Sequence, residues 1–254
     1  MPRIICVIPA RYASSRFPGK PLALLLGTPM IQHVWQRCQE ARCFDEVRVA
    51  TDDPRIAEVV ARFGGAVSLT SPTAASGTER VAELARASSG ADDQVFVNVQ
   101  GDEPAIDPRA LATLVAAFVD PQVQMATLVR PLEERERANP NVVKVVRDEL
   151  GGALYFSRHD LPFANALQPI ARWAHVGVYG YRRATLLRLA ALPVTALERA
   201  ESLEQLRALG NGVKIRCCET NTQPQAVDTP ADLAPAEAAL ARLGARAKLP
   251  DPIR

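Results

Sequence analysis

The stretch IICVI at Ile4–Ile8 is a continuous apolar run that ends at Pro9. A strand buried on both faces of a parallel sheet has this pattern, because neither row of its alternating side chains meets water. Strand patterns recur at 46–51, 67–70, 95–99 and 124–129, and helical patterns lie between them, as at 79–87. The alternation predicts an α/β fold, a mostly parallel sheet covered by helices on both faces.

The middle of the chain departs from this alternation. Strand patterns at 142–147 and 153–156 flank a turn at Gly151-Gly152. Adjacent strands joined by a tight turn run antiparallel. We therefore expect a smaller antiparallel subregion, at approximately 132–190, inserted into one α/β domain that spans 1–254.

The last third returns to the α/β pattern. Thr195 and Glu198 have the spacing of a capping box, which predicts one long helix that ends near Gly210. A strand pattern follows at 214–218, and Thr229-Pro230 begins a final helix.

The composition of the 254 residues excludes several classes of protein. The 30 Lys and Arg nearly balance the 28 Asp and Glu, and 48% of the residues are hydrophobic, which excludes disorder and disfavours a nucleic-acid binder. No apolar run approaches the roughly 20 residues needed to span a bilayer. The apolar stretch near the N-terminus is too short for a signal peptide. We therefore expect a cytoplasmic protein without membrane insertion, with reduced cysteines.

A basic loop follows the first predicted strand. Arg11, Arg16 and Lys20 lie on it among small residues. Ligands of open parallel sheets bind at the carboxyl ends of strands, and cations with accessible backbone N–H groups suit a polyphosphate. A solvated basic loop is the alternative. The loop has neither the GxGxxG nor the GxxxxGK[ST] pattern, which disfavours a dinucleotide oxidoreductase and a P-loop kinase.

An acidic cluster follows the strand predicted at 95–99. Asp102 comes after Gly101 at the end of this buried strand, where a carboxylate suits a phosphate-bound Mg²⁺. A cap of a turn or helix is the alternative role for Asp102. Glu103 has a weaker claim, because adjacent residues on an extended chain point in opposite directions. The basic loop and the carboxylate together indicate nucleotidyl or phosphoryl transfer.

A series of motifs runs in order over nearly the whole chain. It comprises PARYAS at 9–14, PGKPL at 18–22, ATD at 50–52, SGTER at 76–80, VNVQGDEP at 97–104, NPN at 139–141, KVV at 144–146, ALYFSR at 153–158, GVYGY at 177–181, LEQLR at 203–207 and VDTP at 227–230. This ordered set resembles the 3-deoxy-manno-octulosonate cytidylyltransferase family, also called CMP-Kdo synthetases, where Kdo is 3-deoxy-D-manno-octulosonate.

The resemblance implies a Rossmann-like nucleotidyltransferase fold, a homodimer, and a reaction of CTP with Kdo. The products are CMP-Kdo, used in lipopolysaccharide biosynthesis, and pyrophosphate. In-line attack of the anomeric hydroxyl on the α-phosphate needs alignment and charge neutralisation. By resemblance, Arg11, Ser14, Arg16 and Lys20 hold the triphosphate, and the implied catalytic residues are Arg11, Lys20 and Asp102.

The resemblance also implies residues that face the nucleotide and residues that bind the metal. Arg80 and Gln100 face the nucleotide, and Asp102 and Asp228 are the Mg²⁺ ligands. Without the resemblance, Arg80 is an ordinary residue at a helix start, and Asp228 is a cap before Pro230.

The implied residues of the sugar pocket are Arg158, His175, Tyr179, Glu204 and Gln205. Arginine suits the carboxylate of the sugar acid because it binds bidentately. Carboxylate and amide groups can bind several hydroxyls. The alternatives are an exposed helix face for Glu204 and Gln205, a structural role for His175 and core packing for Tyr179.

The stretch at 162–173 departs from the resemblance, because it is short and has few charges where a sugar-side lid is expected. Two other functions therefore remain in view. One is the same chemistry on another acid sugar, an 8-amino Kdo analogue or a sialic acid, although sialic-acid synthetases carry a different N-terminal loop. The other is a non-catalytic nucleotide-binding regulator on this fold, which the presence of both proposed metal carboxylates disfavours.

Overall fold

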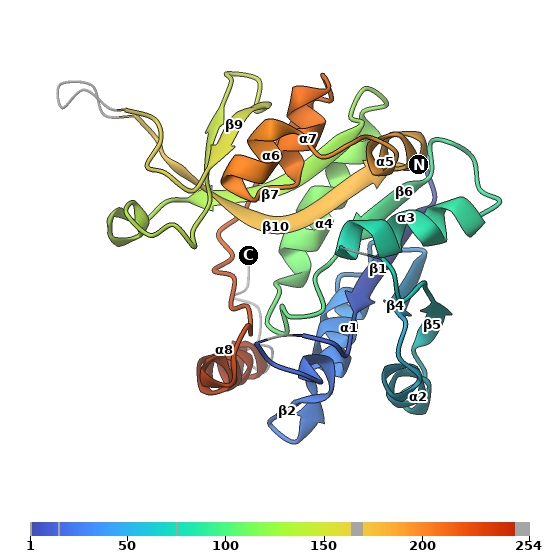
Figure 1. The fold of residues 1–254 in the computed structure, drawn as a ribbon. Coiled ribbons are helices and arrows are strands. Elements are labelled where there is room, and N and C mark those ends of the chain that lie inside the picture. The colour runs from blue at the N-terminus through green and yellow to red at the C-terminus, as the bar shows by residue number, and fades with distance from the viewer. Residues whose placement is uncertain (1, 15, 75, 164–169, 247–254) are drawn as a thin grey trace, which may run out of the picture.

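A computed structural model of the protein describes residues 2–14, 16–74, 76–163 and 170–246. The strands of its main sheet are β1 (Ile4–Ala10), β4 (Glu46–Thr51), β5 (Ala66–Leu69), β6 (Val95–Asn98), β7 (Met125–Pro131), β10 (Trp173–Arg182) and β11 (Ile215–Glu219). They are ordered β11-β7-β10-β6-β1-β4-β5 (Figure 1). β10 runs antiparallel to both neighbours, and the other strands share one direction. The expected mostly parallel sheet is confirmed.

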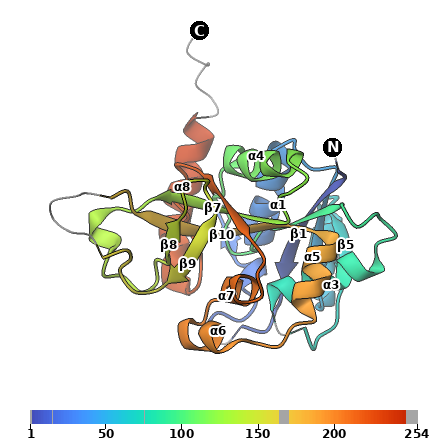
Figure 2. The same ribbon diagram turned by 90° about the horizontal axis from the view of Figure 1, so that it is seen from above.

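The central strand β1 explains how the two faces of the sheet are covered. Ile4, Cys6 and Ile8 pack into one core, whereas Ile5 and Val7 pack into another, because successive side chains point to opposite faces. The first core is covered by α1 (Met30–Glu40), α2 (Pro54–Arg62) and α4 (Pro108–Ala116), and the second by α3 (Gly77–Ala87), α5 (Arg183–Ala190) and α7 (Gln205–Gly210). Figure 2 shows α1 and α4 on one face and α5 and α7 on the other.

The expected antiparallel part in the middle of the chain is present. β8 (Lys144–Arg147) pairs antiparallel with β9 (Ala153–Ser157), and it also pairs with the start of β10. These strands therefore extend the main sheet. Their use as a dimer surface stays a prediction.

The prediction of a single long helix after Thr195 is wrong. The capping box of Thr195 and Glu198 is present, but α6 (Ala196–Glu201) ends at Ser202 before α7 begins. Ser202 has a left-handed backbone with φ of 53°, which stops a right-handed helix. The break buries Leu203 in the second core.

A third, smaller core joins the two ends of the described chain. It contains Leu25 of β2 (Leu24–Leu25), which forms a hairpin with β3 (Thr28–Pro29), together with Ala236 and Leu240 of α8 (Leu233–Arg246). Phe17 of the basic loop packs against it, and Val227 is buried in it. The first and last parts of the chain therefore meet beside the basic loop. The hairpin and α5 were not predicted from the sequence.

Short 3₁₀ helices complete the fold: η1 (Lys20–Leu22), η2 (Ala117–Val119), η3 (Glu134–Glu136) and η4 (Pro230–Asp232). No helix within the described residues is long and apolar enough to cross a membrane.

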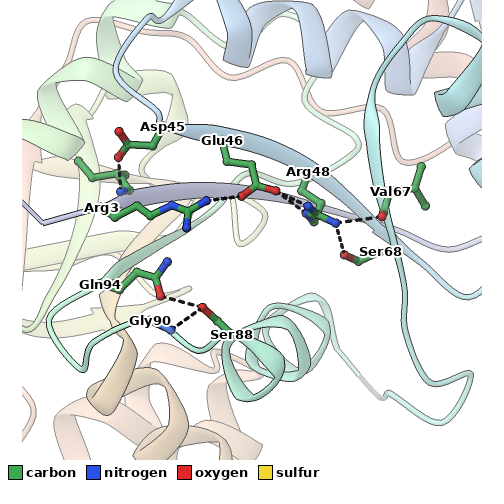
Figure 3. Close-up of polar contacts among 10 residues, drawn as sticks. Arg3, Asp45, Glu46, Arg48, Val67, Ser68, Ser88, Gly90 and Gln94 are labelled. Atoms are coloured by element: carbon green, nitrogen blue, oxygen red, sulfur yellow. Dashed lines mark hydrogen bonds and ion pairs between the residues drawn. The ribbon is translucent and has the colours of Figure 1, made fainter.

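Ion pairs tie the sheet together where the parallel strands begin (Figure 3). Arg3 Nη2 donates to Glu46 Oε2 over 2.9 Å, and Arg48 Nε donates to Glu46 Oε1 over 2.7 Å. Arg48 also donates to Ser68 Oγ over 3.1 Å. One carboxylate therefore links the start of β1 to β4, and Arg48 links β4 to β5.

Candidate active site

A cavity of about 390 Å³ lies where β1 and β6 end. β1 and β6 are neighbouring parallel strands, so the loops that follow them meet at one edge of the sheet. The predicted residues that line the cavity are Arg11, Ser14, Arg16, Lys20, Arg80, Gln100, Asp102 and Asp228. The structure therefore brings the whole predicted nucleotide and metal set together, and the roles of its members stay predictions.

Gly101 allows the loop after β6 to approach β1. A Cβ atom at this position would lie 2.6 Å from the carbonyl oxygen of Pro9. A side chain would force the two strand ends apart, so the close approach requires glycine. The walls of the cavity are placed by this contact between backbones.

Four charged groups of the cavity form ion pairs with one another. Lys20 Nζ lies 2.7 Å from Asp102 Oδ2 and 3.5 Å from Asp228 Oδ1. Arg16 Nη2 lies 3.0 Å from Asp228 Oδ1. No residue in the described part of the chain forms a side-chain hydrogen bond or ion pair with Arg11, which lines the same cavity. Arg11 is therefore the cation most open to an incoming anion.

The two carboxylates fit the requirements of a magnesium ion. Asp102 and Asp228 both contact the ammonium of Lys20, so oxygens from distant parts of the chain already converge on one cation. Within the described residues, no group of three or more His, Cys, Asp or Glu gathers into a complete metal site. Mg²⁺ is commonly held by one or two carboxylates together with phosphates and water. The pair suits an ion that arrives with a nucleotide.

Arg80 is nearly buried at the start of α3. It donates to Thr70 Oγ1 over 2.6 Å and to the carbonyl of Ser71 over 3.2 Å, and its Nη2 lies 3.2 Å from Asp52 Oδ1. The guanidinium thus fixes the loop after β5 against the loop after β4. Asp52, which lies in the ATD motif at 50–52 but was given no role from the sequence, is the partner that neutralises it.

A second cavity of about 80 Å³ lies beside the first. Tyr179, Glu204 and Gln205, three of the predicted sugar residues, line it. Gln100 lines both cavities, so it lies at their boundary. Burial raises the pKa of the Glu204 carboxyl above its usual value. The Gln205 Nε2 group is buried and has no hydrogen-bond partner among the described residues, which marks a free donor on the cavity wall.

Thr78 is a second-cavity residue that sequence reasoning missed. It lines this cavity together with Glu204 and Tyr181. It lies within the SGTER motif at 76–80, which was the available signal. Thr78 therefore connects the start of α3 to the sugar-side wall.

Arg158 lines neither cavity and is engaged by main-chain carbonyls. Its Nε donates to the carbonyl of Glu201 over 2.9 Å, and its Nη1 donates to that of Pro140 over 2.9 Å. Its Nη2 lies 3.4 Å from the carbonyl oxygen of Ser202, at the break between α6 and α7. In this arrangement Arg158 supports the segment that leads to Glu204.

His175 also lies outside both cavities. Its Nε2 is 2.9 Å from Thr127 Oγ1, and its ring packs against those of Phe156 and Tyr179. The Thr127 hydroxyl donates to the carbonyl of Val178, so its oxygen is left to accept a hydrogen bond from His175 Nε2–H. Burial lowers the pKa of His175 to about 3, which keeps the ring neutral.

Glu103 is not among the residues that line the cavity of Asp102. Its Oε2 accepts from the backbone N–H of Gln225 over 3.2 Å. Burial, with the nearby charge of Asp102, raises the pKa of the Glu103 carboxyl to about 8. Its weaker claim to metal binding stays a prediction. In the predicted lid stretch, residues 164–169 lie outside the described residues.

Comparisons with known proteins identify the family. A family model described as cytidylyltransferase matches residues 5–215. A protein of Myxococcus xanthus named 3-deoxy-manno-octulosonate cytidylyltransferase is 54% identical over 243 residues, which cover 95% of this chain and 98% of that protein. This chain belongs to the 3-deoxy-manno-octulosonate cytidylyltransferase family. A relative of the same name from Syntrophotalea carbinolica is 51% identical over 248 residues, covering 93% and 98%.

Solved structures give the same result for the fold. The structure of a CMP:2-keto-3-deoxy-manno-octonic acid synthetase complexed with CTP is 42% identical and has a TM-score of 0.90, covering 95% of this chain and 99% of that one. A glucose-1-phosphate thymidylyltransferase of Bacillus anthracis, described as putative, is 17% identical with a TM-score of 0.63, covering 94% and 95%. The second likeness shows the nucleotidyltransferase fold alone.

Proposed function

We propose that this protein transfers the cytidylyl group of CTP to Kdo, with CMP-Kdo and pyrophosphate as products. The observation that carries the proposal is the cavity at the ends of β1 and β6. In a chain of this family, it combines a basic triphosphate loop with the carboxylates Asp102 and Asp228. The anomeric oxygen forms a bond to the α-phosphorus, the bond from this phosphorus to pyrophosphate breaks, and the hydroxyl proton leaves to solvent.

The basic loop supplies charge neutralisation. Arg11, Arg16 and Lys20 would contact the triphosphate, with Ser14 adding a hydroxyl on the same loop. Cations preorganised around the reacting phosphates stabilise the charge that develops as pyrophosphate leaves. Lys20 would exchange its carboxylate partners for phosphate oxygens when the nucleotide enters.

Asp102 and Asp228 would hold Mg²⁺ in the nucleotide complex. When bound, the ion would lower the pKa of the attacking hydroxyl and neutralise charge on the phosphates. The protein itself contributes by bringing these two carboxylates to the basic loop. The contacts of both carboxylates with Lys20 support this role.

The second cavity is the proposed place of the sugar. Gln100 at the boundary between the cavities would orient the α-phosphate side of the nucleotide against the sugar. Tyr179, Glu204 and Gln205 would bind hydroxyl groups. Arg158 and His175 are proposed sugar-side residues from the family resemblance, with the carbonyl contacts of Arg158 as its resting arrangement.

Three further features are part of the proposal. The protein would work as a homodimer that uses the subregion at 132–190, it would be cytoplasmic, and its product would enter lipopolysaccharide biosynthesis. Size-exclusion chromatography with light scattering would test the dimer, which predicts twice the 27.5 kDa chain mass.

The test is release of pyrophosphate by the purified, folded protein with CTP, Kdo and Mg²⁺. We expect turnover that requires all three and stops with EDTA. Replacing Kdo by an 8-amino Kdo analogue or a sialic acid at fixed CTP separates the acid sugars. CTP binding without turnover on any of these sugars would contradict the proposal and favour the regulator.

A further inference from the structure

We propose that Glu103 is a positioning residue that holds the segment carrying Asp228 against the loop after β6. The inference rests on the proposed function, since it gives Asp228 a purpose as a metal ligand. Glu103 does not line the cavity and acts through the backbone of the segment at 222–228.

That segment has no regular secondary structure of its own. It runs between the end of β11 at Glu219 and the start of η4 at Pro230. Its backbone therefore lacks a ladder of hydrogen bonds that would fix its position. Asp228 must nevertheless come to rest beside Asp102, which lies more than a hundred residues earlier in the chain.

Two hydrogen bonds from the loop after β6 take the place of a ladder. The N–H of Gln225 donates to Glu103 Oε2 over 3.2 Å, and the N–H of Val227 donates to the carbonyl of Asp102 over 2.9 Å. Alternate residues of the segment are thus bound by adjacent residues of the loop. The loop that carries one carboxylate directly positions the segment that carries the other.

The other side of Asp228 is fixed separately. Asp232 Oδ2 accepts from the N–H of Asp228 over 3.0 Å and from that of Thr229 over 2.7 Å. Val227 is fully buried in the third core. Upstream of these contacts, an exposed bond from Gln223 Nε2 to Glu133 Oε1 over 3.0 Å holds a side chain of the segment, whereas Glu103 binds its backbone at Gln225. Loss of the Glu103 bond therefore loosens the backbone nearest to Asp228 on that side.

A positioning role and a direct metal-binding role predict opposite effects of side-chain length and of charge at position 103. A positioning residue needs an acceptor oxygen at the end of a side chain of glutamate length. A direct metal ligand needs a negative charge. Glu103→Gln keeps the length and removes the ionisable carboxyl, whereas Glu103→Asp keeps an ionisable carboxyl and is one methylene shorter. Glu103→Ala removes both, and Glu149→Ala, at an exposed carboxylate in the turn between β8 and β9, is the control.

The experiment measures Mn²⁺ binding to each full-length variant by electron paramagnetic resonance, at saturating CTP and without sugar. We expect Glu103→Gln and Glu149→Ala to bind within about 2-fold of the wild type. Glu103→Asp and Glu103→Ala should bind roughly 10-fold more weakly, as is typical when a residue that orients a ligand is lost. The CTP affinity measured without metal should change little.

Other results would overturn the inference. These are wild-type binding by Glu103→Ala, tight binding by Glu103→Asp with weak binding by Glu103→Gln, or no Mn²⁺ binding by the wild type. If Glu103→Ala does not fold, the difference in Mn²⁺ affinity between Glu103→Gln and Glu103→Asp decides between the two roles. A wild type that binds Mn²⁺ and CTP but releases no pyrophosphate with Kdo would contradict the proposed function and leave the Glu103 comparison intact.

Discussion

Lys20 Nζ lies 2.7 Å from Asp102 Oδ2, although the two residues belong to loops that follow different strands. The contact arises because β1 and β6 are parallel neighbours whose carboxyl ends meet. The same ammonium lies 3.5 Å from Asp228 Oδ1. One lysine therefore joins the basic loop to both proposed metal ligands, and together with Arg16 it balances their two negative charges before a substrate arrives.

Lys20→Met removes the ammonium and keeps an apolar side chain of similar length. We expect kcat/KM for CTP to fall by about 100-fold, since a preorganised group that stabilises developing charge contributes this much or more. Steady-state release of pyrophosphate measures the effect. Lys214→Met, at an exposed lysine before β11, should stay near wild type. An unchanged kcat/KM in Lys20→Met would remove Lys20 from the triphosphate site.

Asp102→Asn keeps the shape of the side chain and removes its charge. We expect loss of Mg²⁺-dependent turnover with the fold intact, because an amide is a poor ligand for a hard cation. The lost ion pair with Lys20 is partly exposed, so the free energy of unfolding should change by only about 0–1 kcal/mol. A magnesium titration of activity, with a thermal melt, checks both. Normal turnover would exclude Asp102 from the metal site.

Only one of the two proposed metal carboxylates could be predicted from the local sequence. Asp102 could be placed from the apolar run before it, because the carboxyl ends of parallel strands share one edge. Asp228 could not, because its segment has no periodic pattern and is positioned by tertiary bonds from Asp102 and Glu103. Only the family resemblance assigned it.

The break at Ser202 shows a second limit. The capping box correctly gave the start of α6, but nothing local in the sequence indicates a left-handed serine six residues later. The carbonyl groups at the break are met by Arg158, which comes from the end of β9. A helix end that is satisfied by a distant arginine cannot be found from local spacing.

Arg158→Ala tests whether this residue serves the sugar or the fold. Loss of its carbonyl contacts should lower the free energy of unfolding by about 2 kcal/mol. If Arg158 also binds the sugar carboxylate, KM for Kdo should rise by about 10-fold or more while KM for CTP stays constant. Urea unfolding and steady-state kinetics measure the two effects. Lower stability with an unchanged KM for Kdo would leave Arg158 a supporting role alone.

Gly101→Ala should destabilise the protein, because the new Cβ would lie 2.6 Å from the Pro9 carbonyl oxygen. We expect a loss of about 1–3 kcal/mol, as for other insertions into packed sites, and a lower rate because the cavity walls separate. Gly177→Ala is the control for stability, since a Cβ there meets no atom within 4 Å. Equal melting temperatures for the two variants would contradict the close approach.

The neutral ring of His175 predicts how stability depends on pH. Burial lowers its pKa from 6.5 to about 3 in the folded protein. Between these values the unfolded chain binds a proton that the folded chain does not. The contribution of His175 to stability is therefore fully present above pH 6.5 and is lost as the pH falls toward 3.

The variant His175→Asn removes this titration and keeps a polar group beside Thr127. The difference in unfolding free energy between wild type and variant should therefore shift against the wild type from pH 7.5 to pH 5, with a slope that approaches roughly one proton. Urea unfolding at several pH values gives the slope. Parallel pH profiles would mean that His175 titrates alike in both states, which is incompatible with a buried ring. Because the folded ring stays neutral, the Nε2–H donated to Thr127 should persist over the same range, and ¹⁵N shifts of His175 provide an independent check.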